Sequence, residues 1–240
     1  MIQYQKSKNI FQSKEWFSSG WDLFKKQPVT WVFMVFIFFV FYVIGTNIYL
    51  GQYVLALLTP ILSGGIFLAA YQANKGERVA FKYLFLMFKC RQRFKQLLII
   101  GTIGACVVGL TELVQVIPGS DYQMRYGSSS DTIALNRNAT SLGDFLSSII
   151  VWAWVSAIFF SIPLVSIKNK MAIESLTSSL GSVITNLMPL GLCYIATFFL
   201  VIVSVIPFGL GLLVTFPILF CTAFFAFKSI YLDCESEIQN

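Results

Sequence analysis

Long apolar runs, separated by short polar segments, set the pattern of this chain. A helix needs about 20 apolar residues to cross the hydrocarbon core of a bilayer. Six runs reach this length: 29–50, 53–73, 97–117, 145–167, 190–207 and 209–232. The last two are separated only by the turn-forming segment PFGLG, and their combined length favours two crossings over one re-entrant hairpin. We therefore predict an all-α fold with one integral membrane domain over residues 1–240 and six transmembrane helices in three hairpins.

An amphipathic pattern precedes the first run, in the segment WFSSGWDLFKKQPVTW (residues 16–31). At about 100° per residue, the aromatic side chains fall on one half of a helix and the lysines on the other. This predicts a helix that lies in the membrane interface, with tryptophan at headgroup depth. Asp22 is spaced to pair with Lys26. A proline suits the first turn of the next helix, so it marks a corner in the chain. The predicted anchor residues are Trp16, Trp21, Lys25, Lys26 and Pro28.

Related segments precede the third and fifth runs. In AIESLTSSLGSVITNLMP (172–189), leucine and isoleucine follow a helical spacing opposite a face rich in serine and threonine. Gly181 precedes Pro189 by eight residues, as Gly20 precedes Pro28. The segment FKYLFLMFKCRQRFK (81–95) has an apolar stripe and a basic face but no terminal proline. We therefore expect three repeated units, each an interfacial helix followed by a transmembrane hairpin.

The positions of lysine and arginine predict the orientation of the chain. Of the 17 basic residues, all but Arg125 and Arg137 lie on the side that holds both termini. Basic residues are enriched in cytoplasmic loops, so we expect both termini in the cytoplasm. The cytoplasmic segments are then 1–28, which holds the interfacial helix, and 168–189, which is amphipathic, while 119–144 forms an external loop. A cleavable signal peptide fits poorly, because the first run is too long and begins too far along the chain.

Composition supports a membrane protein and excludes several kinds of site. The chain is 57% hydrophobic and 12% charged, against about 25% charged residues in soluble domains. It has no histidine, and its five cysteines show no CxxC spacing, so we expect no metal or other cofactor. No phosphate loop, carboxylate pair or nucleotide fingerprint appears, so we expect no enzymatic activity. The net charge of +6 comes from residues that flank the apolar runs, which favours anionic lipid headgroups on the cytoplasmic side over nucleic acid.

A family resemblance rests on the pattern W-x4-GW-x6-P, formed by Trp16, Gly20, Trp21 and Pro28. A hydrophobic hairpin follows, with proline and Gly-Gly in its second helix. This arrangement resembles a group of bacterial inner-membrane proteins of unassigned function, the YciC-like group, and is similar to the membrane portion of some glycerophosphodiester phosphodiesterases. The resemblance implies a multi-pass protein of the bacterial inner (cytoplasmic) membrane. It carries no catalytic residues.

One acidic residue, Glu112, lies well inside an apolar run. An ionisable group in a span suggests an ion path, a proton relay or a partner contact. Its position near the predicted outer end equally allows contact with water. We expect Asn47 and Gln115 to join it in a polar patch of the outer leaflet.

Small residues recur every four positions along the third and fourth runs. Such ridges let helix backbones approach closely, within the protein or between two copies. The predicted packing residues are Gly101, Ala105, Gly109, Ala153, Ala157 and Ser161. Prolines at 60, 163 and 217 predict kinks, which are either structural or hinges.

A basic cluster stands before the third run. It either sets the topology of the chain or binds anionic lipid or a partner protein. Its members are Lys82, Lys89, Arg91, Arg93 and Lys95. Together these features favour a non-enzymatic membrane accessory or scaffold protein that binds lipid or another membrane protein. The alternative is a transporter or channel for a small or lipid-like solute, with the polar groups near Glu112 lining part of the route.

Overall fold

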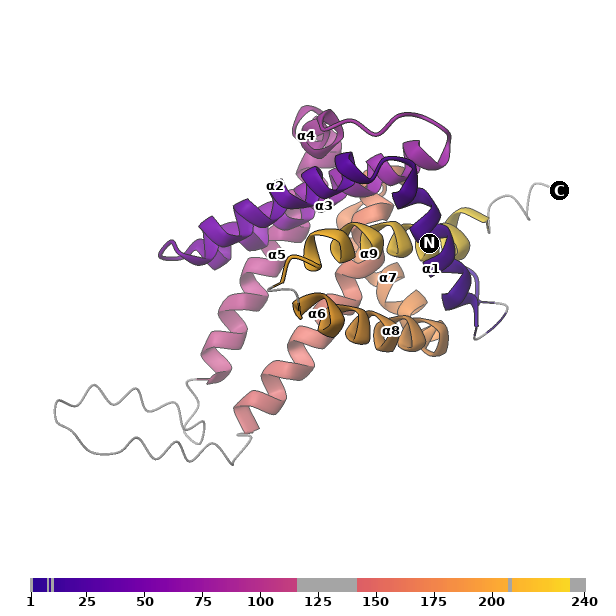
Figure 1. Cartoon of the computed structure of the whole chain (residues 1–240). Helices are drawn as coiled ribbons and strands as arrows, with labels where there is room; N and C mark the ends of the chain where they lie inside the picture. Colours follow the sequence, from indigo (N-terminus) through magenta and orange to yellow (C-terminus); the bar gives the residue numbers. More distant parts are fainter. Residues whose placement is uncertain (1, 8, 10, 116–141, 207–208, 234–240) are drawn as a thin grey trace.

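A computed structural model describes residues 2–7, 9, 11–115, 142–206 and 209–233, which form helices and turns and contain no strand (Figure 1). The expected external loop lies outside these residues except for 142–144, and so do Arg125 and Arg137. The helices are α1 (Gln12–Lys26), α2 (Pro28–Thr46), α3 (Gly51–Asn74), α4 (Lys82–Lys89), α5 (Arg91–Gln115), α6 (Leu142–Lys168), α7 (Ala172–Thr185), α8 (Leu187–Val205) and α9 (Leu212–Phe227). A π-helical turn, η1 (Lys228–Leu232), continues α9.

Six of these helices are long and apolar enough to cross a membrane: α2, α3, α5, α6, α8 and α9 with its π-helical turn. They pair along the chain into three hairpins, which confirms the predicted all-α polytopic fold. Their ends agree with the apolar runs within a few residues. The largest difference is at α5, which begins at Arg91 rather than near residue 97, because the basic residues continue the helix beyond its apolar part.

The six long helices form an inner and an outer set. In the spans of α3, α6 and α9, 61%, 44% and 50% of the residues are buried, whereas α2, α5 and α8 have 22%, 22% and 17%. The inner set therefore contains the second helix of each hairpin. Each inner helix also holds one internal proline, at the positions where the sequence predicts kinks: Pro60, Pro163 and Pro217.

Of the three short helices, α1 precedes the first hairpin, while α4 and α7 connect successive hairpins, and all three pack on the bundle in a cyclic order. Helix α4 packs on α3, α7 packs on α6, and α1 packs on α9. Each short helix therefore contacts the inner helix of the preceding unit, and α1 closes the ring on the last unit. This arrangement follows the three units expected from the sequence. We call α1, α4 and α7 the collar.

Small residues allow these close contacts. A Cβ atom on Gly65 of α3 would lie 2.5 Å from the Leu84 carbonyl oxygen of α4. A Cβ atom on Gly20 of α1 would lie 2.8 Å from the Thr222 backbone nitrogen of α9. Because real Cβ atoms do not approach other atoms so closely, a larger side chain at either glycine would push the two helices apart.

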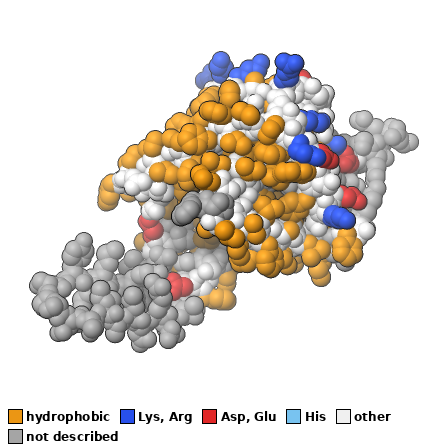
Figure 2. All heavy atoms as spheres, in the orientation of Figure 1, with side chains coloured by type: hydrophobic (Ala, Val, Ile, Leu, Met, Phe, Trp, Pro, Cys, Tyr) orange, Lys and Arg blue, Asp and Glu red, His pale blue; other side chains and the backbone are white. Residues whose placement is uncertain are grey.

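The two ends of the bundle differ in charge. The turn between α2 and α3 and the facing ends of α5 and α6 point to the left and lower left in Figure 1, away from α1 and α4. Lysine and arginine side chains gather along the top and right of the same view, over the collar end (Figure 2). Hydrophobic side chains cover much of the surface between.

Candidate functional site

Helix α4 presents two different faces. Tyr83 and Leu84 are buried against α3, together with Met87 one turn later. The phenylalanines of the opposite face are 45%, 41% and 42% exposed: Phe81, Phe85 and Phe88. The helical repeat of 3.6 residues separates the two sets, so one face of α4 packs on the protein and the other is a surface of aromatic rings.

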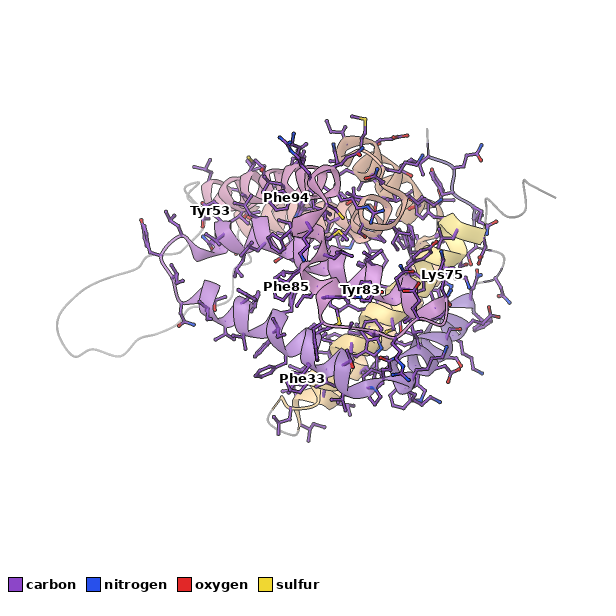
Figure 3. The ribbon with its side chains drawn as sticks, turned by 90° about the horizontal axis from the view of Figure 1, so that it is seen from above. Phe33, Tyr53, Lys75, Tyr83, Phe85 and Phe94 are labelled. Atoms are coloured by element: carbon purple, nitrogen blue, oxygen red, sulfur yellow. The ribbon has the colours of Figure 1, made fainter. Side chains whose placement is uncertain are left out.

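The exposed phenylalanines belong to a row of rings from three helices. Phe81 meets Phe33 of α2 edge to face, with 5.8 Å between the ring centroids. Phe85 lies 6.4 Å from Phe88, which lies 5.7 Å from Phe94 of α5. Seen from the α4 side, Phe33, Phe85 and Phe94 follow one another across the molecule (Figure 3). We call these five residues the aromatic row.

The predicted basic cluster lies beside the aromatic row. Lys82 and Lys89 are at the two ends of α4, and the others are in the first turns of α5: Arg91, Arg93 and Lys95. All are exposed except Arg93, which is partly buried. None of the five forms a salt bridge with another described residue. Their positive charges are therefore available to an anionic ligand.

The connection before α4 is fixed by polar contacts. The Tyr83 hydroxyl donates a hydrogen bond of 3.0 Å to the Glu77 carboxylate. The Val79 backbone N–H donates to the Gln27 side-chain oxygen at the corner between α1 and α2, also at 3.0 Å. Burial raises the pKa of Tyr83, and the hydrogen bond to Glu77 and its negative charge raise it further. Tyr83 thus stays neutral and holds α4 in place.

The structure corrects the predicted role of Trp16 in α1. Its side chain is only 3% exposed and belongs to a buried cluster with Phe160, Leu190 and Phe227. The close approach at Gly20 lets α9 and its neighbours, rather than headgroups, cover this face of α1.

The other predicted anchor residues of α1 lie at its surface. Trp21 is 45% exposed, stacks on Phe24 and has the Lys25 ammonium 5.9 Å from its ring centroid. Asp22 pairs with Lys25 at 2.9 Å rather than with Lys26, which is exposed. Pro28 begins α2, at the predicted corner.

Helix α7 packs in the opposite sense to its hydrophobic pattern. Its buried residues are mostly serines, and the Ser179 hydroxyl donates a 2.9 Å bond to the Ser156 carbonyl of α6. The apolar side chains Ile173 and Ile184 are exposed instead. Small polar residues allow close helix packing within a membrane. The serine face is therefore the packing face, and the apolar face points outward.

Glu112 has partners that the sequence did not indicate. Its carboxylate accepts a hydrogen bond from the Gln52 amide and one of 2.5 Å from the Tyr53 hydroxyl, both at the start of α3. Asn47 is not in this group, because its amide donates to the Val43 carbonyl at 2.7 Å and caps α2. The side chain of Gln115 lies outside the described part. Knowing the pairing of α3 with α5 would have been necessary to find Gln52 and Tyr53.

The small residues of α5 and α6 differ in their surroundings. Gly101 faces the α3 backbone, and its Cβ would lie 2.8 Å from the Leu57 Cα. Gly109 faces the Tyr53 ring, and Ala105 is partly buried. On α6, Ala157 and Ser161 are buried. Ala153 is exposed although the adjacent Trp154 packs on Gly104 of α5, so internal packing does not include Ala153.

A buried polar cluster at the collar end was not anticipated. The Tyr231 hydroxyl donates to the Ser182 hydroxyl at 2.8 Å, and the Tyr231 carbonyl accepts a 2.7 Å bond from the Lys168 ammonium. Asn186 accepts a bond from the Ser7 N–H at 2.6 Å. These contacts join the first residues of the chain to α6, α7 and the π-helical turn.

The described residues offer surfaces for contact rather than a cluster of metal-ligating side chains. Within the described residues, no group of three or more His, Cys, Asp or Glu side chains could hold a metal ion. Comparison with family models, curated proteins and solved structures finds no match for this chain.

Proposed function

We propose that this chain is a non-enzymatic accessory or scaffold protein of the bacterial inner membrane, with both termini in the cytoplasm, and that α4 binds anionic lipid. The observation that carries the proposal is the aromatic row beside five basic side chains that have no described acidic partner. The two features belong to one short helix and the segment after it.

The physical argument combines two attractions. Aromatic side chains on one face of an in-plane helix insert at the boundary between headgroups and acyl chains. Each lysine or arginine near an anionic membrane surface contributes about 1 kcal/mol. A helix with both features is held at the membrane more firmly than either alone would allow. Because α4 is also fixed to α3, lipid bound there is bound to the whole protein.

The transporter alternative has less support. It would need polar groups that continue inward from Glu112. The described partners of Glu112 are Gln52 and Tyr53, at the same end of α3. Deeper along α3 and α5 the buried side chains are apolar, including Ile61, Leu97 and Ile100, except for Ser63, whose hydroxyl donates to the Thr59 carbonyl of its own helix. This pattern favours a scaffold over a route for a solute.

The test compares lipid retention in matched variants. The protein is purified in mild detergent with mixed phosphatidylglycerol and phosphatidylethanolamine, and bound lipid is measured by mass spectrometry. Replacing Lys82, Lys89 and Arg91 with glutamine should lower phosphatidylglycerol retention by about fivefold for each charge removed, the equivalent of about 1 kcal/mol. The control replaces the exposed lysines Lys14 and Lys26 of α1 with glutamine and should retain most of the lipid.

An equal loss for each charge removed in the two variants would show that only net charge matters and would contradict a site on α4. No loss in either would reject lipid binding there. If a membrane protein instead co-purifies in fixed ratio and is released by Phe85→Ala, the aromatic row is a protein interface rather than a lipid site.

A further inference from the structure

A cavity of about 180 Å³ lies between α6, α8 and α9. Its lining is almost entirely apolar, and small side chains on facing helices create the space. Cys193 and Thr197 stand on α8, opposite Ala223 and Ala226 on α9. Phe159 of α6 closes one side. The cavity is separate from the aromatic row, which is formed by α2, α4 and α5.

The cyclic order of the units explains why space remains here. In each unit the outer helix can lie along the inner helix of the preceding unit. Helix α5 lies tightly along α3, with Gly101 against Leu57. Helix α2 contacts α9, with Phe38 and Phe220 6.3 Å apart.

We call the line of contact between an outer helix and the preceding inner helix a seam. The third seam, between α8 and α6, is open. The backbones of these helices do not pack closely, and the ring contact between Phe159 and Tyr194, at 5.8 Å, joins them across the gap. Gly191 of α8 has no neighbour within 4 Å of the place where its Cβ would be. The cavity is the space that a tighter seam would have filled.

The position of the cavity determines what can enter it. Its α8 residues lie in the first three turns after the collar, and its α9 residues lie near the collar end of that helix. It therefore lies in the half of the span nearer the collar. Tyr194 at its edge is 42% exposed, and the adjoining surface of α8, with Ile195 and Phe198, is exposed and apolar. The mouth consequently opens toward the hydrocarbon of the bilayer.

The size of the cavity selects among apolar occupants. An engineered protein cavity of about 150 Å³ stays dry and admits benzene. A helix is about 10 Å across with its side chains, so neither a partner's helix nor a second copy of α8 fits. A short length of one hydrocarbon chain does fit. We propose that this cavity binds one acyl chain of a lipid in the leaflet on the collar side.

Photocrosslinking tests this site directly. The full chain is placed in vesicles of phosphatidylethanolamine that contain a small fraction of the same lipid with a diazirine on one acyl chain. After irradiation, crosslinked peptides are mapped by mass spectrometry. Crosslinks should concentrate at residues 193–197 and 222–226. An even spread over the exposed surface of α8 and α9 would mean ordinary boundary lipid and would overturn the proposal.

Two variants fill the cavity from opposite walls, Ala223→Phe and Thr197→Leu. Each should abolish the concentrated crosslinks, and the second serves if the first does not fold. Ile195→Phe adds similar bulk on the exposed face of α8 and should leave them unchanged. Persistence of the crosslinks in both filled variants would exclude the cavity as the site. Thr197→Val, which replaces the hydroxyl of a cavity-lining residue with a methyl group, should preserve crosslinking because a hydrocarbon chain needs no polar partner. Loss of the crosslinks in this variant would overturn the assignment of the cavity to a hydrocarbon chain.

Discussion

At the scale of single residues, the structure depends on a few positions where no side chain can be added. Gly20 is the clearest, because α1 and α9 meet there with backbone against backbone. The Thr222 hydroxyl and backbone occupy the space that a Cβ on Gly20 would need. The aromatic residues around it are buried only because this contact is close.

Gly20→Ala should therefore destabilise the protein. Adding a methyl group to a filled contact typically costs about 1–3 kcal/mol. Gly191→Ala is the matched control, because it adds the same methyl group at a helical position where no other atom lies within 4 Å. The higher helix propensity of alanine should make this variant as stable as the wild-type protein or more stable. Thermal unfolding in detergent measures both changes. A lower melting temperature for Gly191→Ala than for Gly20→Ala would contradict the proposed contact.

At the scale of elements, periodicity identified two faces of each short helix but did not show what covers them. In α1 and α4 an apolar face is buried, whereas in α7 the serine face is buried and the isoleucines are exposed. The long spans were predictable because the thickness of a bilayer fixes their length. The partners of Glu112 were not, since they depend on how the hairpins align.

Tyr83 gives α4 a pH dependence that can be measured. Its pKa is raised above the ordinary value of 10.0, so the folded protein holds this proton more tightly than the unfolded chain. The stabilisation is then fully present below pH 10 and is lost as the pH rises through the raised pKa. Tyr83→Phe removes the hydrogen bond to Glu77, which contributes about 1 kcal/mol.

The difference in stability between the wild-type protein and Tyr83→Phe should be constant from pH 7 to 9 and should decrease above pH 10. Chemical unfolding at a series of pH values measures it. Tyr49→Phe, at an exposed tyrosine in the turn between α2 and α3, controls for the removal of a hydroxyl group. A difference that increases above pH 10 would show that the sign of the pKa shift is wrong.

At the scale of the whole molecule, the three units are held in a ring by contacts between the two ends of the chain. The first residues lie against α7, α8 and the π-helical turn. The Gln5 N–H donates to the Ile230 carbonyl at 3.0 Å, and Asn186 bonds to Ser7. Asn186 is only 1% exposed, and its side chain bonds in both directions: the oxygen accepts from the Ser7 N–H, while the amide nitrogen donates to the Gln5 carbonyl and to the Ser182 carbonyl of α7.

Asn186→Ala should release the first residues without unfolding the bundle. The loss of buried hydrogen bonds costs about 1–3 kcal/mol, which raises the population of a locally open form. Cleavage by trypsin after Lys6 should therefore be faster in the variant. Thr185→Ala, at the exposed neighbour, should be cleaved at the wild-type rate. Equal rates in all three proteins would mean that the first residues are held by other contacts.

The closure of the ring by α1 and α9 also has a consequence for the order of events during synthesis. The two helices that meet at Gly20 and Thr222 are separated by some 200 residues. A ribosome adds about 5–20 residues per second, so α1 waits for roughly 10–40 s before α9 exists. Its apolar face must lie on the membrane surface during that interval. The amphipathic pattern of residues 16–31 therefore describes the nascent helix, which rests on lipid first and exchanges lipid for protein when the last span arrives.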